Sequence, residues 1–548
     1  MSQALEHHPA PTGSQASAWA PLGRPAFRAL WLATVVSNVG TWMHDVGAAW
    51  LMTSLSPSAT MVALVQTATS LPMFLLVLPA GALADLLDRR RFLLAAQLWM
   101  MAAATMLAAL AFLDQVDPAV LLLATAALGI GAAMSAPSFQ AIVAELVPQT
   151  EMPAAVALNS LGVNLSRAVG PALGGMIVAA TSPAAVFALN ALSTVCVVVA
   201  LLTWKREVAA VSLPPERFLP GLLSGLRYAL HAPLLRNVMI RTLGFLVPAS
   251  ATWALLPLVA RRELGVDAFG YGILLGCMGA GALGLALVLP GFRKRLGPDR
   301  LLLLAGAGFA AATAILAFAQ HAAVAALALV LAGAAWLAAL STLNAGAQAT
   351  SAGWVKARAL SLYLVGFFGA MALGSLAWGA LSDATGPRTA LGIAAVLGLA
   401  ALLLARHAPL ADTEALDLGA SGILGEAEGL PGIAPDHGPV LVQIEYVVAA
   451  GRRDAFLAAA AELRHVRHRA GASGWGLYAD PLAPSRFVES FTNPTWLAHQ
   501  RQHLRMSRHD AELLAAARAF HGGDGPPRVL HLVGGAGLSA SPPGGQPQ

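Results

Sequence analysis

The chain of 548 residues is 57% hydrophobic and 11% charged, with a mean hydropathy of +0.67, and apolar stretches of about 20 residues recur along it. This is more apolar surface than a soluble core buries, so the composition predicts a polytopic membrane protein and excludes an ordinary soluble enzyme. The formal net charge is +5, but the basic residues lie between apolar runs and form no contiguous stripe, so no nucleic-acid partner is expected.

Residues 1–23 lack a basic region followed by an apolar one, which predicts a disordered cytoplasmic tail rather than a signal peptide. Twelve apolar segments follow, and each must be a helix because the lipid bilayer offers the backbone no water to bond. With an error of about three residues at each end, they run near 27–53, 61–84, 92–113, 119–144, 155–180, 184–203, 238–260, 271–290, 301–319, 322–345, 359–381 and 389–405.

The longest connection among these segments, residues 204–237, separates an N-terminal half (24–203) from a C-terminal half (238–406). The predicted fold class is therefore an all-α membrane protein with 12 transmembrane helices in two six-helix halves. Lys and Arg collect in alternate connections, seventeen on one side against three on the other, which places both termini in the cytoplasm. The seventeen are Arg24, Arg28, Arg89, Arg90, Arg91, Lys205, Arg206, Arg217, Arg227, Arg236, Arg293, Lys294, Arg295, Arg300, Lys356, Arg358 and Arg406.

The connection after the second segment, residues 81–91, reads GALADLLDRRR. Its arginines fix the orientation of the chain, but orientation requires neither Gly81 nor Asp85. The connection after the eighth segment reads GFRKRLGPDR and repeats the glycine, as Gly291, and a basic end that includes Arg295. Equivalent places in the two halves thus carry related loops, which supports an internal repeat.

The fifth segment contains GPALGG at residues 170–175, and GSLAWG at residues 374–379 is its counterpart in the eleventh. Glycines on a membrane helix let a neighbouring helix approach closely, and a proline interrupts the backbone ladder where a helix bends. The residues concerned are Gly170, Pro171, Gly174 and Gly175. Ordinary packing of small residues is the alternative explanation.

The loop after the second segment resembles the signature loop of the major facilitator superfamily. The matching positions are Gly81, Asp85, Arg89 and Arg90. Leu86 stands where the family usually has a base, and Asp88 where it has a glycine. In the family this loop and its second copy gate the cytoplasmic side, and the aspartate engages the other half in the outward-open state. The resemblance implies the same role for Asp85.

GPALGG resembles the core of the family's antiporter signature, which is associated with export. Residues 25–405 as a whole are similar to bacterial exporters of the enterobactin-exporter type, also called transmembrane secretion effectors. The resemblance implies a multi-pass protein of the bacterial inner membrane that exchanges a small-molecule substrate for protons.

Two strongly ionised residues, Asp45 and Arg167, lie well inside the apolar segments, and Arg241 lies nearer the end of one. Such charges normally face a partner or a water-filled path. Helical periodicity places polar side chains on one face with each of them: Asn38, Thr41, Trp42 and Asp45 in the first segment, and Ser160, Asn164 and Arg167 in the fifth. Asp45 is predicted to couple transport to protons, or to make a structural hydrogen bond near the outer interface. Whether it pairs with Arg167 stays open, and His44 is expected to be a packing residue.

After Arg406 an acidic, flexible linker (407–437) leads to a small α+β domain (438–533) and a disordered tail (534–548). The domain reads as strands at 440–448, 475–480, 486–491 and 528–533, with helices at 452–469 and 494–520, in the ferredoxin-like order βαββαβ. It resembles the antibiotic-biosynthesis monooxygenase dimeric α/β barrel, which implies a homodimer formed through the sheets.

His499 and His503 share a face of the last helix, but no third ligand is indicated, so a solvated basic face is predicted and no metal. Trp475, Tyr478 and Trp496 are interpreted as core aromatics rather than pocket residues. The domain is therefore expected to serve dimerisation or regulation.

No ATP-binding motif, catalytic nucleophile or cofactor fingerprint is present in the sequence. The predicted function is secondary export of a siderophore, drug or other lipophilic metabolite by proton antiport and alternating access, without a cofactor. Two alternatives stay open at this point: a transporter fused to a cofactor-independent monooxygenase-like domain, and a non-transporting membrane sensor.

Overall fold

The computed structural model describes residues 17–204, 228, 231–352, 354–410, 417–418, 421 and 433–534, with only the backbone of residues 82, 85, 86, 144, 149 and 357. Most of the predicted tails at 1–23 and 534–548, and most of both predicted linkers, lie outside the described residues, but Ala20–Gly23 of the first tail form a helical turn.

The N-terminal half consists of six long helices. They are α1 (Pro25–Leu55), α2 (Ala59–Leu86), α3 (Arg89–Phe112), α4 (Pro118–Leu146), α5 (Met152–Ala180) and α6 (Pro183–Thr203), with short turns η1 (Ala20–Gly23) and η2 (Gln149–Glu151). Their starts carry the expected signals: the side chains of Ser58, Asp88 and Asp117 cap α2, α3 and α4, and prolines begin α1, α4 and α6. All six predicted segments are present.

The C-terminal half consists of α8 (Pro233–Leu258), α9 (Ala268–Phe318), α10 (Ala322–Ala349), α11 (Lys356–Thr385) and α12 (Pro387–Ala401), with a π-turn η3 (Val259–Glu263) after α8 and η4 (Leu402–Arg406) after α12. The 51-residue α9 contains two predicted segments joined at Gly297, whose φ of 69° is left-handed. Both arms lie against α10: the Cβ positions at Gly281 and Gly308 meet Val330 and Leu331. The chain therefore reverses at Gly297, and six segments are present here too.

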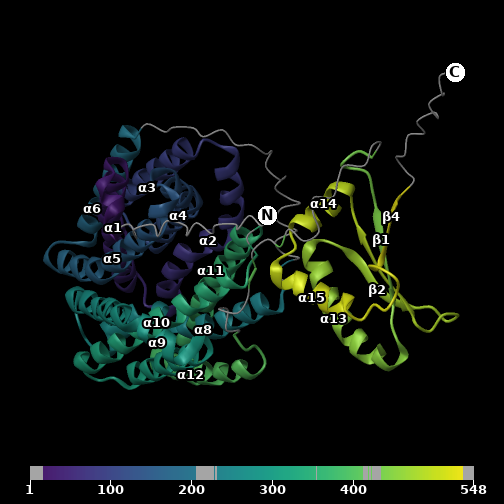
Figure 1. The fold of residues 1–548 in the computed structure, drawn as a ribbon. Helices are drawn as coiled ribbons and strands as arrows, with labels where there is room; N and C mark the ends of the chain where they lie inside the picture. Colours follow the sequence, from purple (N-terminus) through teal and green to yellow (C-terminus); the bar gives the residue numbers. More distant parts are fainter. Residues whose placement is uncertain are drawn as a thin grey trace.

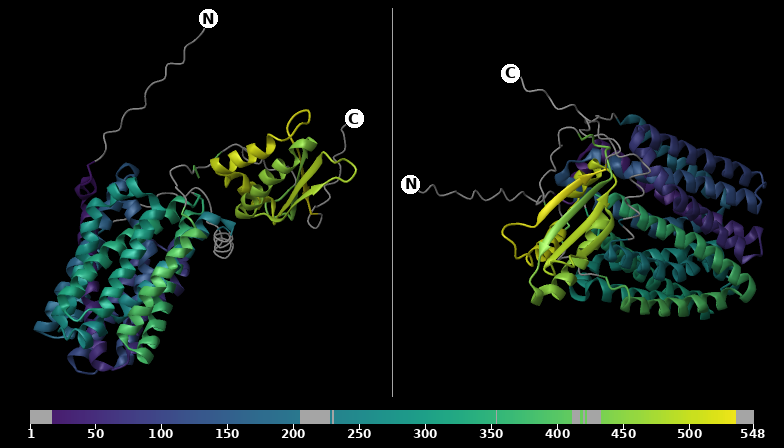
Figure 2. Two further views of the ribbon diagram at one scale, coloured as in Figure 1. Left: turned by 90° about the horizontal axis from the view of Figure 1, so that it is seen from below. Right: turned by 90° about the vertical axis from the view of Figure 1, so that its right-hand side faces the viewer.

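The two halves lie side by side, purple to blue against teal to green (Figures 1 and 2). They meet along α2 with α11 and along α5 with the first arm of α9. Below, the near end of the bundle is the end at which α1 begins and the soluble domain attaches, and the far end is the end with the α1–α2 turn.

The soluble domain has the predicted ferredoxin-like topology. Its strands are β1 (Val440–Val447), β2 (Ser473–Ala479), β3 (Arg486–Asn493) and β4 (Arg528–Val533), in the antiparallel order β2-β3-β1-β4. The helices α13 (Arg453–Ala470), α14 (Trp496–Leu504) and α15 (Arg508–Arg518), with the turn η6 (Ala450–Arg452), complete it. Val440, Val442, Ile444 and Tyr446 alternate into its core.

The single long helix predicted at 494–520 is wrong, because two helices, α14 and α15, occupy this stretch. The first ends at Leu504, and Ser507 caps the second: its hydroxyl accepts from the Asp510 backbone N–H, and the Asp510 carboxylate accepts from the Ser507 backbone N–H. This capping box satisfies backbone groups that a continuous helix would have bonded internally, so the helix restarts there.

The soluble domain contacts the near end of the C-terminal half. The Arg505 guanidinium lies 4.2 Å from the centre of the Trp354 ring, and the Arg469 guanidinium lies 5.7 Å from that of Tyr228. Buried Tyr228 donates to the Thr350 carbonyl and accepts from the Ala352 N–H, in the α10–α11 connection. The α10–α11 connection is therefore the docking point of the domain.

Candidate functional site

The polar residues predicted on α1 and α5 lie in the middle of the bundle. Asn38, Thr41, Asp45, Asn164 and Arg167 are each partly exposed. The Thr41 hydroxyl donates to the Ser37 carbonyl, and the Asn164 amide donates to the Ser160 carbonyl at 2.8 Å. Each of these two side chains thus uses a hydrogen-bond donor on the backbone of its own helix and has fewer donors left for a ligand.

Asp45 and Arg167 do not form an ion pair with each other or with another described residue. The Arg167 guanidinium instead lies over the Trp42 ring, 5.5 Å from its centre. Asp45 lies near enough to Tyr271 of α9 to act on its hydroxyl electrostatically. Both charges therefore lie beside aromatic rings close to the junction of the two halves.

His44 points away from this region, as the sequence predicted. It is buried and packs against Phe187 of α6, with ring centres 4.8 Å apart. Arg241, also singled out, is buried in the C-terminal half, where it lies 3.4 Å from Asp299. Neither residue joins the central group.

Sequence reasoning missed a row of aromatic rings that crosses from one half to the other. Trp42 of α1 lies 6.2 Å from Trp253 of α8, which lies 5.3 Å from Trp336 of α10, measured between ring centres. Trp336 also contacts Phe245 and Phe367. Single tryptophans on separate helices give no sequence signal, because only folding brings them together.

The GPALGG motif serves two helix contacts on different faces of α5. A Cβ at Gly170 would lie 2.5 Å from the Trp42 Cβ, and one at Gly174 would lie 2.8 Å from the Met43 Cα, both on α1. A Cβ at Gly175 would lie 2.5 Å from the Ala268 carbonyl oxygen on α9 of the other half, and the Pro171 carbonyl faces Gly272. The motif therefore sets close packing both within its half and between the halves.

Polar contacts join the halves at the far end. The Asp383 carboxylate of α11 accepts from the Ser58 hydroxyl at 2.7 Å and from the backbone N–H groups of Ala59 and Thr60 at 2.6 and 3.0 Å. This carboxylate thus binds the N-terminus of α2, where the backbone N–H groups lack helical partners.

Two arginines after α8 add to these far-end contacts. Arg261 donates to the hydroxyls of Thr53 and Ser54, at 2.9 and 2.5 Å, and Arg262 donates to the Pro57 carbonyl at 2.6 Å. Together with Asp383 they close the far end, and this group of three is called the far-end gate below. No sequence pattern had singled it out.

One face of α2 follows α11 of the other half from the far end toward the near end. Its residues at seven-residue spacing are Thr60, Thr67, Phe74 and Gly81. Cβ positions at Gly379 and Gly369 would meet Thr60 and Phe74 within 3 Å, and the Thr67 hydroxyl donates to the Ala372 carbonyl. A Cβ at Gly81 would meet no described atom within 4 Å. At Gly81 the described residues therefore give no contact with α11, and several side chains of the last turn of α2 lie outside the described residues.

Two arginines of the predicted gating loop, Arg89 and Arg90, make bonds within their own half. Arg89 pairs with Glu145 of α4 at 3.0 Å, and Arg90 donates to the Leu201 and Leu202 carbonyls at the end of α6. Asp85 lies in the last turn of α2, and its side chain lies outside the described residues. In the second copy of the loop, Gly291 and Arg295 are exposed on α9.

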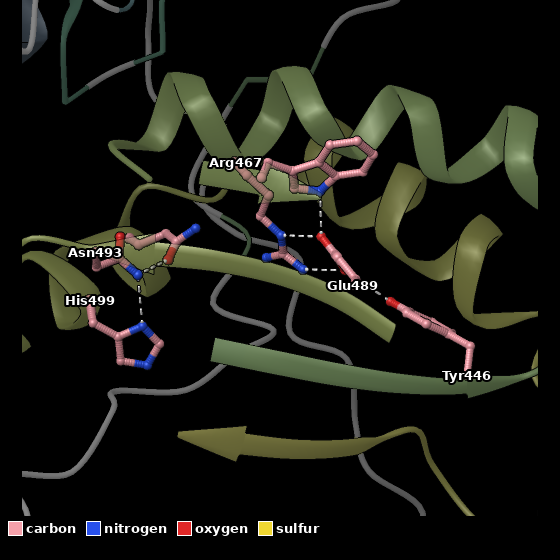
Figure 3. Close-up of polar contacts among 7 residues, drawn as sticks. Tyr446, Arg467, Glu489, Asn493 and His499 are labelled. Carbon is pink, nitrogen blue, oxygen red and sulfur yellow. Dashed lines mark hydrogen bonds and ion pairs between the residues drawn. The ribbon is translucent and has the colours of Figure 1, made fainter. Parts of the chain in front are cut away.

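The soluble domain buries a polar group between its helices and its sheet (Figure 3). Arg467 pairs with Glu489 at 2.9 Å, and the Trp475 indole and the Tyr446 hydroxyl also donate to this carboxylate. Burial alone would raise the pKa of Glu489, but the charge and hydrogen bonds of Arg467, with the other two donors, hold it below its ordinary value. All members of the group are thus mutually satisfied, as a structural network requires.

The prediction of a solvated His499 and His503 face is wrong for His499, which is 2% exposed and bonds Asn493. Burial, with His503 and His531 nearby, lowers the pKa of His499 to about 3. Trp496 is a core residue as expected, whereas Tyr478 is 60% exposed. No group of three or more metal-ligating side chains occurs in the described part of the chain.

The fold consists of two six-helix halves that meet through α2 with α11 and through α5 with α9, around charged and aromatic residues at mid-depth. This arrangement defines a transporter of the major facilitator superfamily. Solved transporters share the fold. A bacterial homologue of the human lysosomal transporter Spinster, in an inward-facing and unoccupied conformation, aligns with a TM-score of 0.56 and 15% identity over 70% of this chain and 94% of its own. A POT family transporter in complex with 5-aminolevulinic acid aligns with a TM-score of 0.59 and 13% identity over 70% and 96%.

The chain belongs to the transmembrane secretion effector family, whose profile matches residues 16–537 and so includes the soluble domain. It is 25% identical over 260 residues to the staphyloferrin A transporter of Staphylococcus aureus, covering 47% of this chain and 65% of that one. It is 29% identical over 286 residues to the enterobactin exporter EntS of Shigella flexneri, covering 52% and 67%. The aligned region thus spans about two thirds of each relative.

Proposed function

We propose that this protein exports small organic molecules across the bacterial inner membrane by alternating access of its two halves. One observation carries the proposal: the far-end gate joins the halves, while at Gly81, toward the near end of α2, no described atom lies within 4 Å of the Cβ position. The excess of basic residues in the connections at the near end supports a cytoplasmic position for this end and for both termini. The structure then corresponds to the state that loads substrate from inside the cell.

Asp85 and Asp383 support a two-position gate, because each lies in the last turn of one of two antiparallel helices that meet across the halves. Asp383 binds the N-terminus of α2 at the far end. We assign Asp85 the matching role at the near end, binding the N-terminus of α11 when the cytoplasmic side closes. The other loop residues, Arg89 and Arg90, hold α3, α4 and α6 in place behind it.

Asp45 is the proposed proton carrier. It is a partly exposed carboxylate at membrane depth without a hydrogen-bond donor among the described residues, and an acid in this setting marks an ion pathway. The likeness to an enterobactin exporter and a staphyloferrin A transporter supports a small-molecule substrate, which we propose is exchanged for protons.

The test is transport in inside-out vesicles from cells that produce this chain, with enterobactin and staphyloferrin A as the first probes. An imposed proton gradient should drive uptake of a substrate, and the substrate should in turn move protons. Asp45→Asn should abolish the effect of the gradient, whereas Asp117→Asn, an exposed cap of α4, should not. Gradient-independent uptake by the unmodified protein would contradict proton coupling.

We also propose that two copies pair through the open face of the soluble-domain sheet. Tyr478, Leu530 and Leu532 are 60%, 40% and 46% exposed, and their strand register places them on the face opposite the buried side chains of β1. Exposed apolar area of this kind marks an interface. Leu530→Glu with Leu532→Glu should convert a dimer to a monomer in light scattering, and an unchanged mass would contradict the pairing.

A further inference from the structure

The row formed by Trp42, Trp253 and Trp336 contains hydrogen-bond donors without an acceptor. The indole N–H groups of Trp253 and Trp336 and the Nε–H of Arg167 are buried, and none has a partner among the described residues. An indole N–H removed from water normally finds an acceptor, since leaving it unbonded costs free energy. Three such donors therefore collect along one aromatic row at the junction of the halves.

Other tryptophans of the membrane helices show that the fold can satisfy this group. Trp31 donates to the Leu158 carbonyl at 2.9 Å, Trp99 to the Ala127 carbonyl at 2.7 Å, and Trp378 to the Val247 carbonyl at 2.7 Å. Among the described tryptophans of the membrane helices, Trp253 and Trp336 are thus the two whose indole N–H is buried without a partner. Trp42, Trp253 and Arg167 also keep part of their side chains exposed at mid-depth.

We infer that this row, with Arg167, binds an anionic ligand that carries an aromatic ring. The ring stacks on the faces of Trp42 and Trp253, and its carboxylate or phenolate oxygens accept hydrogen bonds from Arg167 and the indoles. Arg167 supplies the charge, because no described carboxylate pairs with it. Asp45 lies one helical turn farther along α1, beside Tyr271 rather than over the row. This inference rests on the proposed function, whose substrate class it names.

Binding of four small probes to the full-length protein in lipid nanodiscs tests the inference. They are salicylate, an anionic aromatic; phenol, a neutral one; benzyltrimethylammonium, a cationic one; and cyclohexanecarboxylate, an anion without an aromatic ring. Salicylate should bind at least about tenfold more tightly than each of the others, by calorimetry. Trp253→Phe, which keeps a ring and removes the donor, should weaken salicylate binding about tenfold, and Arg167→Gln at least as much. Arg167→Lys should retain part of the affinity, and Trp99→Phe all of it.

Three results would each overturn the inference. One is tight binding of benzyltrimethylammonium, and another is a salicylate affinity that is unchanged in Trp253→Phe and Arg167→Gln. The third is a lack of binding of every probe to protein that still shows an intact thermal unfolding transition. Vesicle transport separates this failure from failure of the proposed function. If the protein exports a compound and Trp253→Phe leaves the export rate unchanged, the proposed binding site is refuted and the proposed transport function is not. Binding as expected without export of any tested anion refutes the transport assignment alone.

Discussion

The carboxylate of Asp383 accepts a 2.7 Å hydrogen bond from the hydroxyl of Ser58, the residue that caps α2 in the other half of the molecule. The same carboxylate accepts from two backbone N–H groups of that helix. The N-terminus of a helix attracts an anion, and here the anion comes from the opposite half. Closure of the far end therefore depends on a contact that breaks whenever the halves separate there.

Asp383→Ala should shift the molecule toward the state open at the far end. Hydrogen bonds to a charged group contribute about 1.5–3 kcal/mol each, so loss of this group should change the ratio of states at least about tenfold. The measurement is labelling by an impermeant maleimide of a cysteine at Thr67, which lies buried below the gate, in protein without Cys196 and Cys277.

The matched control for this change is Asp267→Ala. Asp267 is also a far-end acid, but it caps its own helix, α9, through Gly270. Its loss should leave the labelling rate at Thr67 unchanged. Equal rates in unmodified protein and Asp383→Ala would show that Asp383 does not hold the gate.

Gly175→Ala should impair transport without unfolding the protein, because the new Cβ would lie 2.5 Å from a carbonyl oxygen of the other half. The halves can avoid this clash by separating at the far end, so the variant should favour the outward-open state. Gly174→Ala should instead lower the thermal stability of the N-terminal half, since its clash is with α1. Gly284→Ala meets open space and serves as the control. Normal transport by Gly175→Ala would refute the role assigned to this glycine.

Arg505→Ala should release the soluble domain from the membrane part, since Arg505 lies over Trp354 at the docking point. A cation over an indole contributes about 0.5–2 kcal/mol, so release should be partial. Hydrogen exchange at the α10–α11 connection should become faster. Arg528→Ala, on the outer strand β4, should change nothing there. Exchange that stays slow in Arg505→Ala would show that the docking depends on other contacts.

The soluble domain should lose stability as the pH falls below about 6.5. His499 has its pKa lowered from 6.5 to about 3 in the folded domain, so the unfolded chain binds a proton across this interval that the folded domain excludes. The contribution of His499 to the free energy of unfolding therefore falls by up to about 1.4 kcal/mol for each unit by which the pH decreases. His499→Gln should flatten the slope, as measured by exchange of β1 amides. An unchanged slope would assign the pH dependence to other groups.

The sequence predicted the helices well because a bilayer imposes a simple rule: every span must be a helix of about 20 apolar residues. It predicted the order of the soluble strands for a similar reason, since their alternation is regular. The break between α14 and α15 was missed because Ser507 and Asp510 compete with helix continuation through side-chain bonds, a local effect that apolar periodicity does not report.

The candidate site was predicted only in part. Asp45 and Arg167 stand out because charge is rare at membrane depth, but their lack of pairing depends on how α1, α5 and α9 cross. Trp253, Trp336 and Asp383 carry no local pattern. Their roles arise from contacts between residues far apart in sequence, such as Ser58 with Asp383, and these exist only after the two halves meet.

The most direct test of alternating access is the distance between spin labels at both ends of the protein in nanodiscs. One pair, at Ala180 and Ala384, spans the halves at the far end, and the other, at Leu87 and Phe292, spans them at the near end; all four positions are exposed. Conditions that drive transport should lengthen the first distance and shorten the second together, and Asp383→Ala should shift both the same way without a gradient. Two distances that stay fixed, or that lengthen together, would contradict the account.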